Sequence, residues 1–139
     1  MMSSIFFHWH PACVLFSTTA LFAGFALEIK PLFESARPKP AVLAARVLLW
    51  VGTVGLLMSV WTGYLHPGKS VVFLDKSPQL LNHRFLGFWI FAVFVVISFW
   101  RLLTGRRTNV LLVLVWLAAL WVLGVQLLGG LRLADHIPF

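Results

Sequence analysis

The sequence predicts an all-α integral membrane protein: one domain of 139 residues that forms a four-helix transmembrane bundle with up-down topology. Hydrophobic residues make up 60% of the chain and charged residues only 11%, whereas a soluble domain carries about 25% charged residues. Four apolar stretches each approach the length of about 20 residues that spans a bilayer. No segment alternates apolar and polar residues with a period of two, which disfavours a transmembrane β-barrel.

The same composition disfavours several functional classes. A chain this apolar could not cover a water-exposed surface, so a soluble enzyme and a soluble binding module are both disfavoured. The net charge of +7 comes from basic residues between apolar stretches, which is typical of loops beside membrane spans, so no nucleic-acid partner is expected. The single cysteine, Cys13, excludes an internal disulfide. No Asp, Glu or Lys lies deep in an apolar stretch, and no catalytic motif is present, so no catalytic residue is predicted.

The first two spans have recognisable ends. The first covers about residues 12–29, and Pro11 suits its first helical position, where a missing N–H has no cost. We interpret it as a retained span rather than a secretory signal, because no basic segment precedes it and Glu28-Ile29-Lys30-Pro31 is a poor cleavage site. The second span covers about residues 41–65, and His66-Pro67-Gly68 stops it.

The third span covers about residues 80–103, with Ser77-Pro78 as its N-cap and first-turn proline. The fourth covers about residues 110–133. Four helices with short connections predict an up-down-up-down bundle, so both termini lie on one side of the membrane.

The basic residues predict the orientation of this bundle. The side opposite the termini holds seven of them: Lys30, Arg37, Lys39, Arg46, Arg101, Arg106 and Arg107. The side of the termini holds four: Lys69, Lys76, Arg84 and Arg132. Because cytoplasmic loops carry the excess of basic residues, the termini are predicted to be periplasmic in a bacterial cytoplasmic membrane. Tryptophans near both ends are interpreted as interfacial belts: Trp9, Trp61 and Trp89 near the termini, and Trp50, Trp100 and Trp116 nearer the opposite side.

All five histidines fall on the side of the termini. His8 is interpreted as a loop residue, His10 borders the first span, His66 closes the second, His83 opens the third and His136 follows the fourth. Histidine is a common metal ligand and an axial ligand of haem iron, and helical bundles build such sites from facing helices. His83 lies deepest in its helix and is the strongest candidate ligand, and His10 is the preferred second ligand. His136 and His66 are the substitutes.

Small and polar residues are predicted at the same level as the histidines. Thr62-Gly63 and Gly129-Gly130 lie near the ends of the second and fourth spans, where glycines allow close approach of a helix or a flat macrocycle. Gln126 precedes the second glycine pair by one turn. A polar group in lipid needs a partner, so we expect Gln126 to face the bundle interior or another subunit.

These residues together resemble a known family of small bacterial membrane proteins, domain of unknown function 2231. The similar motifs, in the same order and on the same helices, are His8-Trp9-His10-Pro11, Thr62-Gly63, Leu81-Asn82-His83 and Leu128-Gly129-Gly130 through His136. The chain differs at Leu131-Arg132, where the family has an acidic residue. The resemblance implies a four-helix membrane fold. Relatives sometimes occur beside or fused to Rieske iron–sulfur domains, which implies redox work on the periplasmic side.

The residues predict a membrane electron-transfer subunit that carries one b-type haem near the periplasmic face, with His83 and His10 as axial ligands. Two other interpretations stay open. One is a cofactor-free accessory subunit of a larger membrane complex, and the other is a copper or zinc site built from the same histidines. The expected partners are the lipid bilayer and either other membrane subunits or a periplasmic redox protein.

Overall fold

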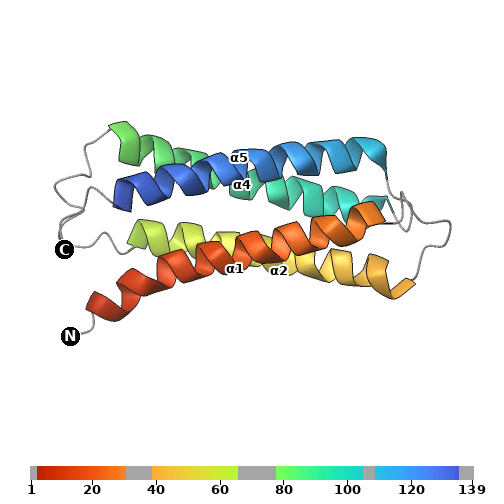
Figure 1. Cartoon of the computed structure of the whole chain (residues 1–139), viewed down its shortest axis with the longest axis horizontal. Helices are drawn as coiled ribbons and strands as arrows, with labels where there is room; N and C mark the ends of the chain where they lie inside the picture. Colours follow the sequence, from red (N-terminus) through yellow and green to blue (C-terminus); the bar gives the residue numbers. More distant parts are fainter. Residues whose placement is uncertain (1–2, 31–38, 66–77, 105–108, 135–139) are drawn as a thin grey trace.

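The computed structural model describes residues 3–30, 39–65, 78–104 and 109–134, which are almost entirely helical. The helices are α1 (Ser3–Ile29), α2 (Lys39–Leu65), α4 (Pro78–Leu103) and α5 (Val110–Ala134). They run alternately up and down in one bundle (Figure 1), which confirms the predicted fold class.

Each helix contains a stretch long and apolar enough to cross a bilayer. These candidate spans are Trp9–Ile29, Pro40–Tyr64, Asn82–Leu103 and Val110–Leu131. Pro78 begins α4 as predicted, since a first-turn proline lacks only an N–H that would have no partner in the helix. Asn109 caps α5, because its side-chain oxygen accepts a hydrogen bond of 2.9 Å from the N–H of Leu111. The sequence therefore specifies a multi-pass membrane protein with four candidate spans.

One predicted boundary was wrong. The first helix was expected to begin at about residue 12, but α1 begins at Ser3, so Pro11 lies inside it. His8 therefore lies in a helix and not in the predicted loop. A proline inside a helix removes the hydrogen bond to the residue four positions earlier, here Phe7, which precedes the apolar span. The helix continues because this lost bond falls outside the span, where water can replace it.

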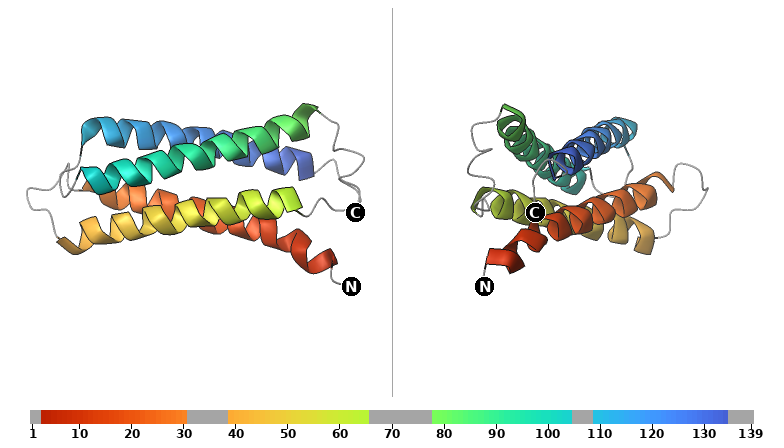
Figure 2. Two further views of the ribbon diagram at one scale, coloured as in Figure 1. Left: turned by 180° about the vertical axis from the view of Figure 1, so that it is seen from behind. Right: turned by 60° about the vertical axis from the view of Figure 1, so that its left-hand side comes forward.

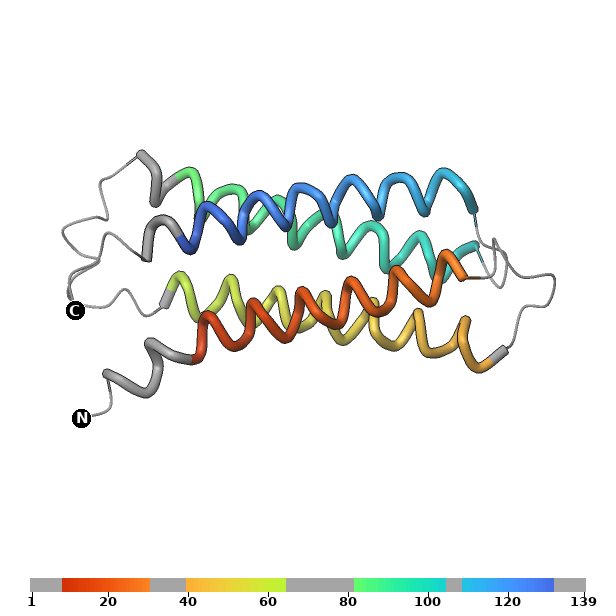
Figure 3. Tube along the Cα trace, in the orientation of Figure 1, coloured from red at the N-terminus to blue at the C-terminus, as the bar shows by residue number. Residues whose placement is uncertain are grey.

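The bundle consists of two helical hairpins that lie one over the other. Hairpin α1/α2 forms one layer and hairpin α4/α5 the other, and α1 begins at the same end of the bundle at which α5 ends (Figure 1, Figure 3). Neighbouring helices pack as α1 with α2, α2 with α4, α4 with α5, and α5 with α1. Consequently α1 and α4 are at opposite corners of the bundle, and they run in the same direction, as the turned view in Figure 2 (right) shows.

The core is apolar and draws on all four helices, with the fully buried residues Leu21, Leu49, Phe94 and Trp116 near its centre. Trp116 was predicted to belong to an interfacial belt, and this was wrong. Its ring is fully buried and packs edge-to-face on Phe25, with the ring centroids 5.8 Å apart. A tryptophan that fills a gap between helices buries more apolar surface than one at the interface.

The two hairpins place buried residues at matching positions. A residue in α1 matches the residue 73 positions later in α4, and a residue in α2 matches the residue 67 positions later in α5. Matched pairs in which both residues are at most 5% exposed include Leu21 and Phe94, Glu28 and Arg101, Ala45 and Leu112, Leu49 and Trp116, and Leu56 and Leu123. The bundle is therefore built from two similar units in the same orientation.

Candidate functional site

His10, near the start of α1, is held by the facing helix α2. Its Nδ1 lies 2.9 Å from the carbonyl oxygen of Ser59 and 3.3 Å from Oγ1 of Thr62. A carbonyl oxygen can only accept a hydrogen bond, so the hydrogen of the neutral ring is on Nδ1. The lone pair is therefore on Nε2, which is the tautomer that can bind a metal through Nε2.

His83, near the start of α4, is held by Gln126 of α5. The amide nitrogen of Gln126 donates to the carbonyl oxygen of His83 at 2.6 Å and lies 2.9 Å from Nδ1 of the same residue. Because the carbonyl must accept, the atom beside it is the amide nitrogen, and Nδ1 accepts its second hydrogen. The neutral ring of His83 then carries its own hydrogen on Nε2, so the two imidazoles are in opposite tautomers.

Both imidazoles rest on a glycine of the facing helix. A Cβ atom added at Gly63 would lie 3.1 Å from Cε1 of His10, and one added at Gly130 would lie 3.1 Å from Cε1 of His83. These two glycines were predicted at the level of the histidines, and the structure confirms that level. The space that they leave is occupied by the imidazole rings themselves.

The two histidines occupy matching positions at one end of the bundle. We call this end, where α1 and α4 begin, the histidine end (Figure 1). Both side chains are half-buried. The structure thus places His10 and His83, the two histidines favoured as ligands by the sequence, at the same end of the bundle.

The remaining predicted residues have different outcomes. His66 and His136 lie outside the described residues, so their roles stay predictions. Cys13 is half-buried and lines a shallow apolar groove on the outside of hairpin α1/α2, away from the imidazoles. Among the residues that the structure describes, no three metal-binding side chains lie together. That part of the chain offers two imidazoles and no third ligand for a metal ion.

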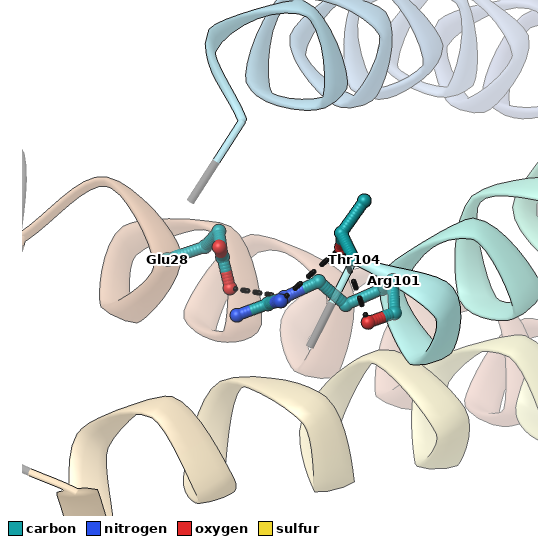
Figure 4. A network of polar contacts seen from close by, with 3 residues as sticks. All are labelled: Glu28, Arg101 and Thr104. Atoms are coloured by element: carbon teal, nitrogen blue, oxygen red, sulfur yellow. Dashed lines mark hydrogen bonds and ion pairs between the residues drawn. The ribbon is translucent and has the colours of Figure 1, made fainter. Parts of the chain in front are cut away.

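Sequence analysis missed a buried ion pair at the opposite end of the bundle. Arg101 was counted among the basic residues of the loop side, but it lies within α4 and only 1% of it is exposed. Its Nε donates to Oε2 of Glu28, 2% exposed, at 2.9 Å, and its NH1 lies 3.4 Å from Oγ1 of Thr104 (Figure 4). The sequence signal was present in the spacing, because Glu28 follows His10 by 18 residues and Arg101 follows His83 by 18.

No protein-family model, curated protein or solved structure matches this sequence.

Proposed function

We propose that this chain is a membrane electron-transfer subunit that binds one b-type haem through His10 and His83. The proposal is based on one observation. Two imidazoles from helices at opposite corners occupy matching positions at one end of the bundle, each with Nδ1 in a hydrogen bond and each resting on a glycine. Metal-binding histidines commonly donate the hydrogen of their second ring nitrogen to a carbonyl or carboxylate, as Nδ1 of His10 does to the carbonyl oxygen of Ser59.

The residues at this site suit a haem better than they suit a zinc ion. Zinc sites in proteins use at least three protein ligands, whereas haem iron needs one or two axial ligands beyond its macrocycle. His10 already has its lone pair on Nε2. For His83 to bind iron through Nε2, its hydrogen must move to Nδ1. The side chain of Gln126 must then leave its present position, because an amide oxygen there would face the carbonyl oxygen of His83.

When bound, the haem would supply the exchange of single electrons between ferrous and ferric iron. The chain would supply the two axial nitrogens and a dry, apolar surrounding. Phe94 and Ile90, which follow His83 along α4, are buried and support such a surrounding. A low dielectric around the iron is one of the factors by which a protein sets its reduction potential.

An absorption spectrum of the protein, purified with ample haem, tests the proposal. The wild type should show a Soret band that shifts on reduction, and both His10→Ala and His83→Ala should lose the low-spin form. The matched control, His66→Ala, should retain it. A wild type without a Soret band would favour the cofactor-free accessory subunit, and metal analysis of the same sample would reveal copper or zinc. Loss of the band in the control and not in His83→Ala would reassign the ligand.

The proposal includes the orientation in the membrane. We infer that the histidine end faces the periplasm of a bacterial cell, because basic residues are more numerous at the opposite end. The electron partner would then be a periplasmic redox protein or another membrane subunit, which agrees with the family resemblance. In a Cys13→Ser background, cysteines at Ser3 and Asn109 should react with an impermeant maleimide from opposite sides. Labelling of both from the same side would overturn the orientation.

A further inference from the structure

Helices α1 and α4 carry the same pair of features at their two ends. Each has a histidine at one end and an ionisable residue 18 positions later, Glu28 after His10 and Arg101 after His83. At 1.5 Å per residue, the two features are about 27 Å apart along each helix. Glu28 and Arg101 bind each other across the bundle, so the two helices that bear the imidazoles are joined directly at their far ends (Figure 4).

Stability alone does not account for this ion pair. Taking two charges out of water costs several kcal/mol for each ion, so a buried pair is often no more stable than apolar residues of the same size. Here the carboxylate also has its second oxygen, Oε1, buried without a hydrogen-bond partner in the described part of the chain. The best-attested use of such a buried polar contact is to fix the register of two helices.

The rest of the interface between the hairpins leaves the register weakly determined. Its contacts are mostly between apolar side chains such as Leu21 and Phe94, and apolar contacts have no preferred direction. The connection between the hairpins, residues 66–77, contains 12 residues, and such a chain reaches up to about 40 Å, enough for several registers. One further buried hydrogen bond joins the hairpins, between Oγ1 of Thr53 and Oγ of Ser98 at 3.0 Å, one turn of α4 before Arg101.

We propose that Glu28 and Arg101 are a positioning pair that fixes α1 against α4 along the membrane normal and thereby holds His10 level with His83. As a statement about haem ligation it rests on the proposed function, but the register itself is a property of the chain alone. A slip by one helical turn would displace the two imidazoles by about 5.4 Å, too far for both to reach one iron atom.

The register can be measured without any cofactor. Spin labels at Trp9→Cys on α1 and Val96→Cys on α4, in a Cys13→Ser background, report the register by pulsed electron paramagnetic resonance. Val96 lies 14 residues beyond the position that matches Trp9, so the measured distance has a large component along the bundle axis. Both positions are exposed on the outside of the bundle, so the labels should not disturb the core. The sample is the full chain in lipid nanodiscs.

Replacing the pair by Glu28→Gln with Arg101→Met removes both charges and leaves side chains of similar size. This variant should insert and remain helical, but its distance distribution should shift or broaden by several ångströms, at most the 5.4 Å rise of one helical turn. Exchanging the two residues, Glu28→Arg with Arg101→Glu, should restore a narrow distribution. Leu102→Ala, at an exposed position beside Arg101, is the control, with no expected change.

A neutral pair with the wild-type distance distribution would overturn the inference. If the neutral pair does not fold, Glu28→Asp is measured instead, because it keeps both charges but shortens the carboxylate side chain. A small shift of the distance would support the positioning role, and an unchanged distance would contradict it. The proposed function can fail separately. A wild type that binds no haem but whose distance distribution depends on the pair would leave the positioning role intact, whereas a haem-binding neutral pair with unchanged distances would refute it.

Discussion

The two hairpins bury residues at matching positions, but they differ in the size of those buried side chains. At four matched buried positions the second hairpin has the larger residue: Phe94 for Leu21, Trp116 for Leu49, Leu112 for Ala45 and Ala119 for Gly52. The distance between packed helices depends on the side chains at their contact. The comparison therefore predicts a closer contact between α1 and α2 than between α4 and α5, and the turned view agrees, since α4 and α5 diverge there (Figure 2, right).

Glycines show how close the first pair is. A Cβ added at Gly24 would lie 3.2 Å from the carbonyl oxygen of Ala45, and one at Gly52 would lie 2.5 Å from Cγ of Leu21. In the second hairpin, a Cβ at Gly124 or Gly129 would meet nothing within 4 Å. Glycine thus serves helix contact in the first hairpin, whereas bulky core residues separate the helices in the second.

The largest expected effect is on stability, from one added methyl group in each hairpin. Gly52→Ala should destabilise the protein by about 2–3 kcal/mol, because the new Cβ must displace Leu21 and also approaches the carbonyl oxygen of Ser17, which cannot move freely. Gly124→Ala, its matched control in α5, should not destabilise the protein, because open space surrounds that position. Reversible unfolding in mixed micelles measures both values.

Equal losses of stability in Gly52→Ala and Gly124→Ala would contradict the difference between the hairpins. A stabilised Gly52→Ala would show that α1 and α2 are not in close contact there. Either result would contradict the difference in helix packing between the two hairpins, and neither would bear on the histidine site.

The second prediction concerns the histidine end, where the hairpins should respond alike. Gly63→Ala and Gly130→Ala each place a Cβ about 3.1 Å from an imidazole carbon, so each should displace its ring and weaken haem binding about tenfold. Gly129→Ala, beside Gly130 but facing open space, should bind haem normally. Titration of the apoprotein with haem measures the three affinities.

A response in only one of the two hairpins would show that the site is not built from matched halves. Normal affinity in both variants would place the haem away from His10 and His83. Weak binding by the Gly129→Ala control would indicate that any substitution near the end of α5 disturbs the bundle.

Sequence analysis predicted the four spans because membrane helices depend on apolar length, a property of each segment by itself. It could not distinguish Trp116, which is in the core, from the tryptophans at the membrane interface. A tryptophan near a helix end can be in either place, and which one depends on the helix that packs beside it. Arg101 was missed for the same reason, because its partner lies 73 positions earlier in the sequence. His10 and His83 were found because histidine is rare in apolar segments. Two of their neighbours, Thr62 and Gln126, were also singled out at that level, because polar side chains are rare there too. The carbonyl of Ser59 was not, because a backbone carbonyl leaves no signal in the sequence.

The smallest expected effect concerns the hydrogen bonds of the two histidines, which differ between the hairpins. The imidazole of His83 depends on a side chain, that of Gln126, whereas the imidazole of His10 depends on the backbone carbonyl of Ser59, which no substitution removes. Gln126→Leu should therefore cost about 1 kcal/mol, the worth of a hydrogen bond, and release the tautomer of His83. Ser59→Ala, at the matching position of α2, should leave His10 in its present tautomer.

Nitrogen-15 chemical shifts of labelled histidine in the haem-free protein distinguish the two tautomers, because a ring nitrogen with hydrogen resonates far from one without. In the wild type, with the two signals identified by their loss in His10→Ala and His83→Ala, His10 should have its hydrogen on Nδ1 and His83 on Nε2. The reason is that a carbonyl oxygen faces Nδ1 of His10 and an amide nitrogen faces Nδ1 of His83. In Gln126→Leu the signal of His83 should become an average of both forms. An unchanged His83 signal would mean that Gln126 does not set its tautomer, and a changed His10 signal in Ser59→Ala would mean that the hydroxyl, rather than the carbonyl, holds that ring.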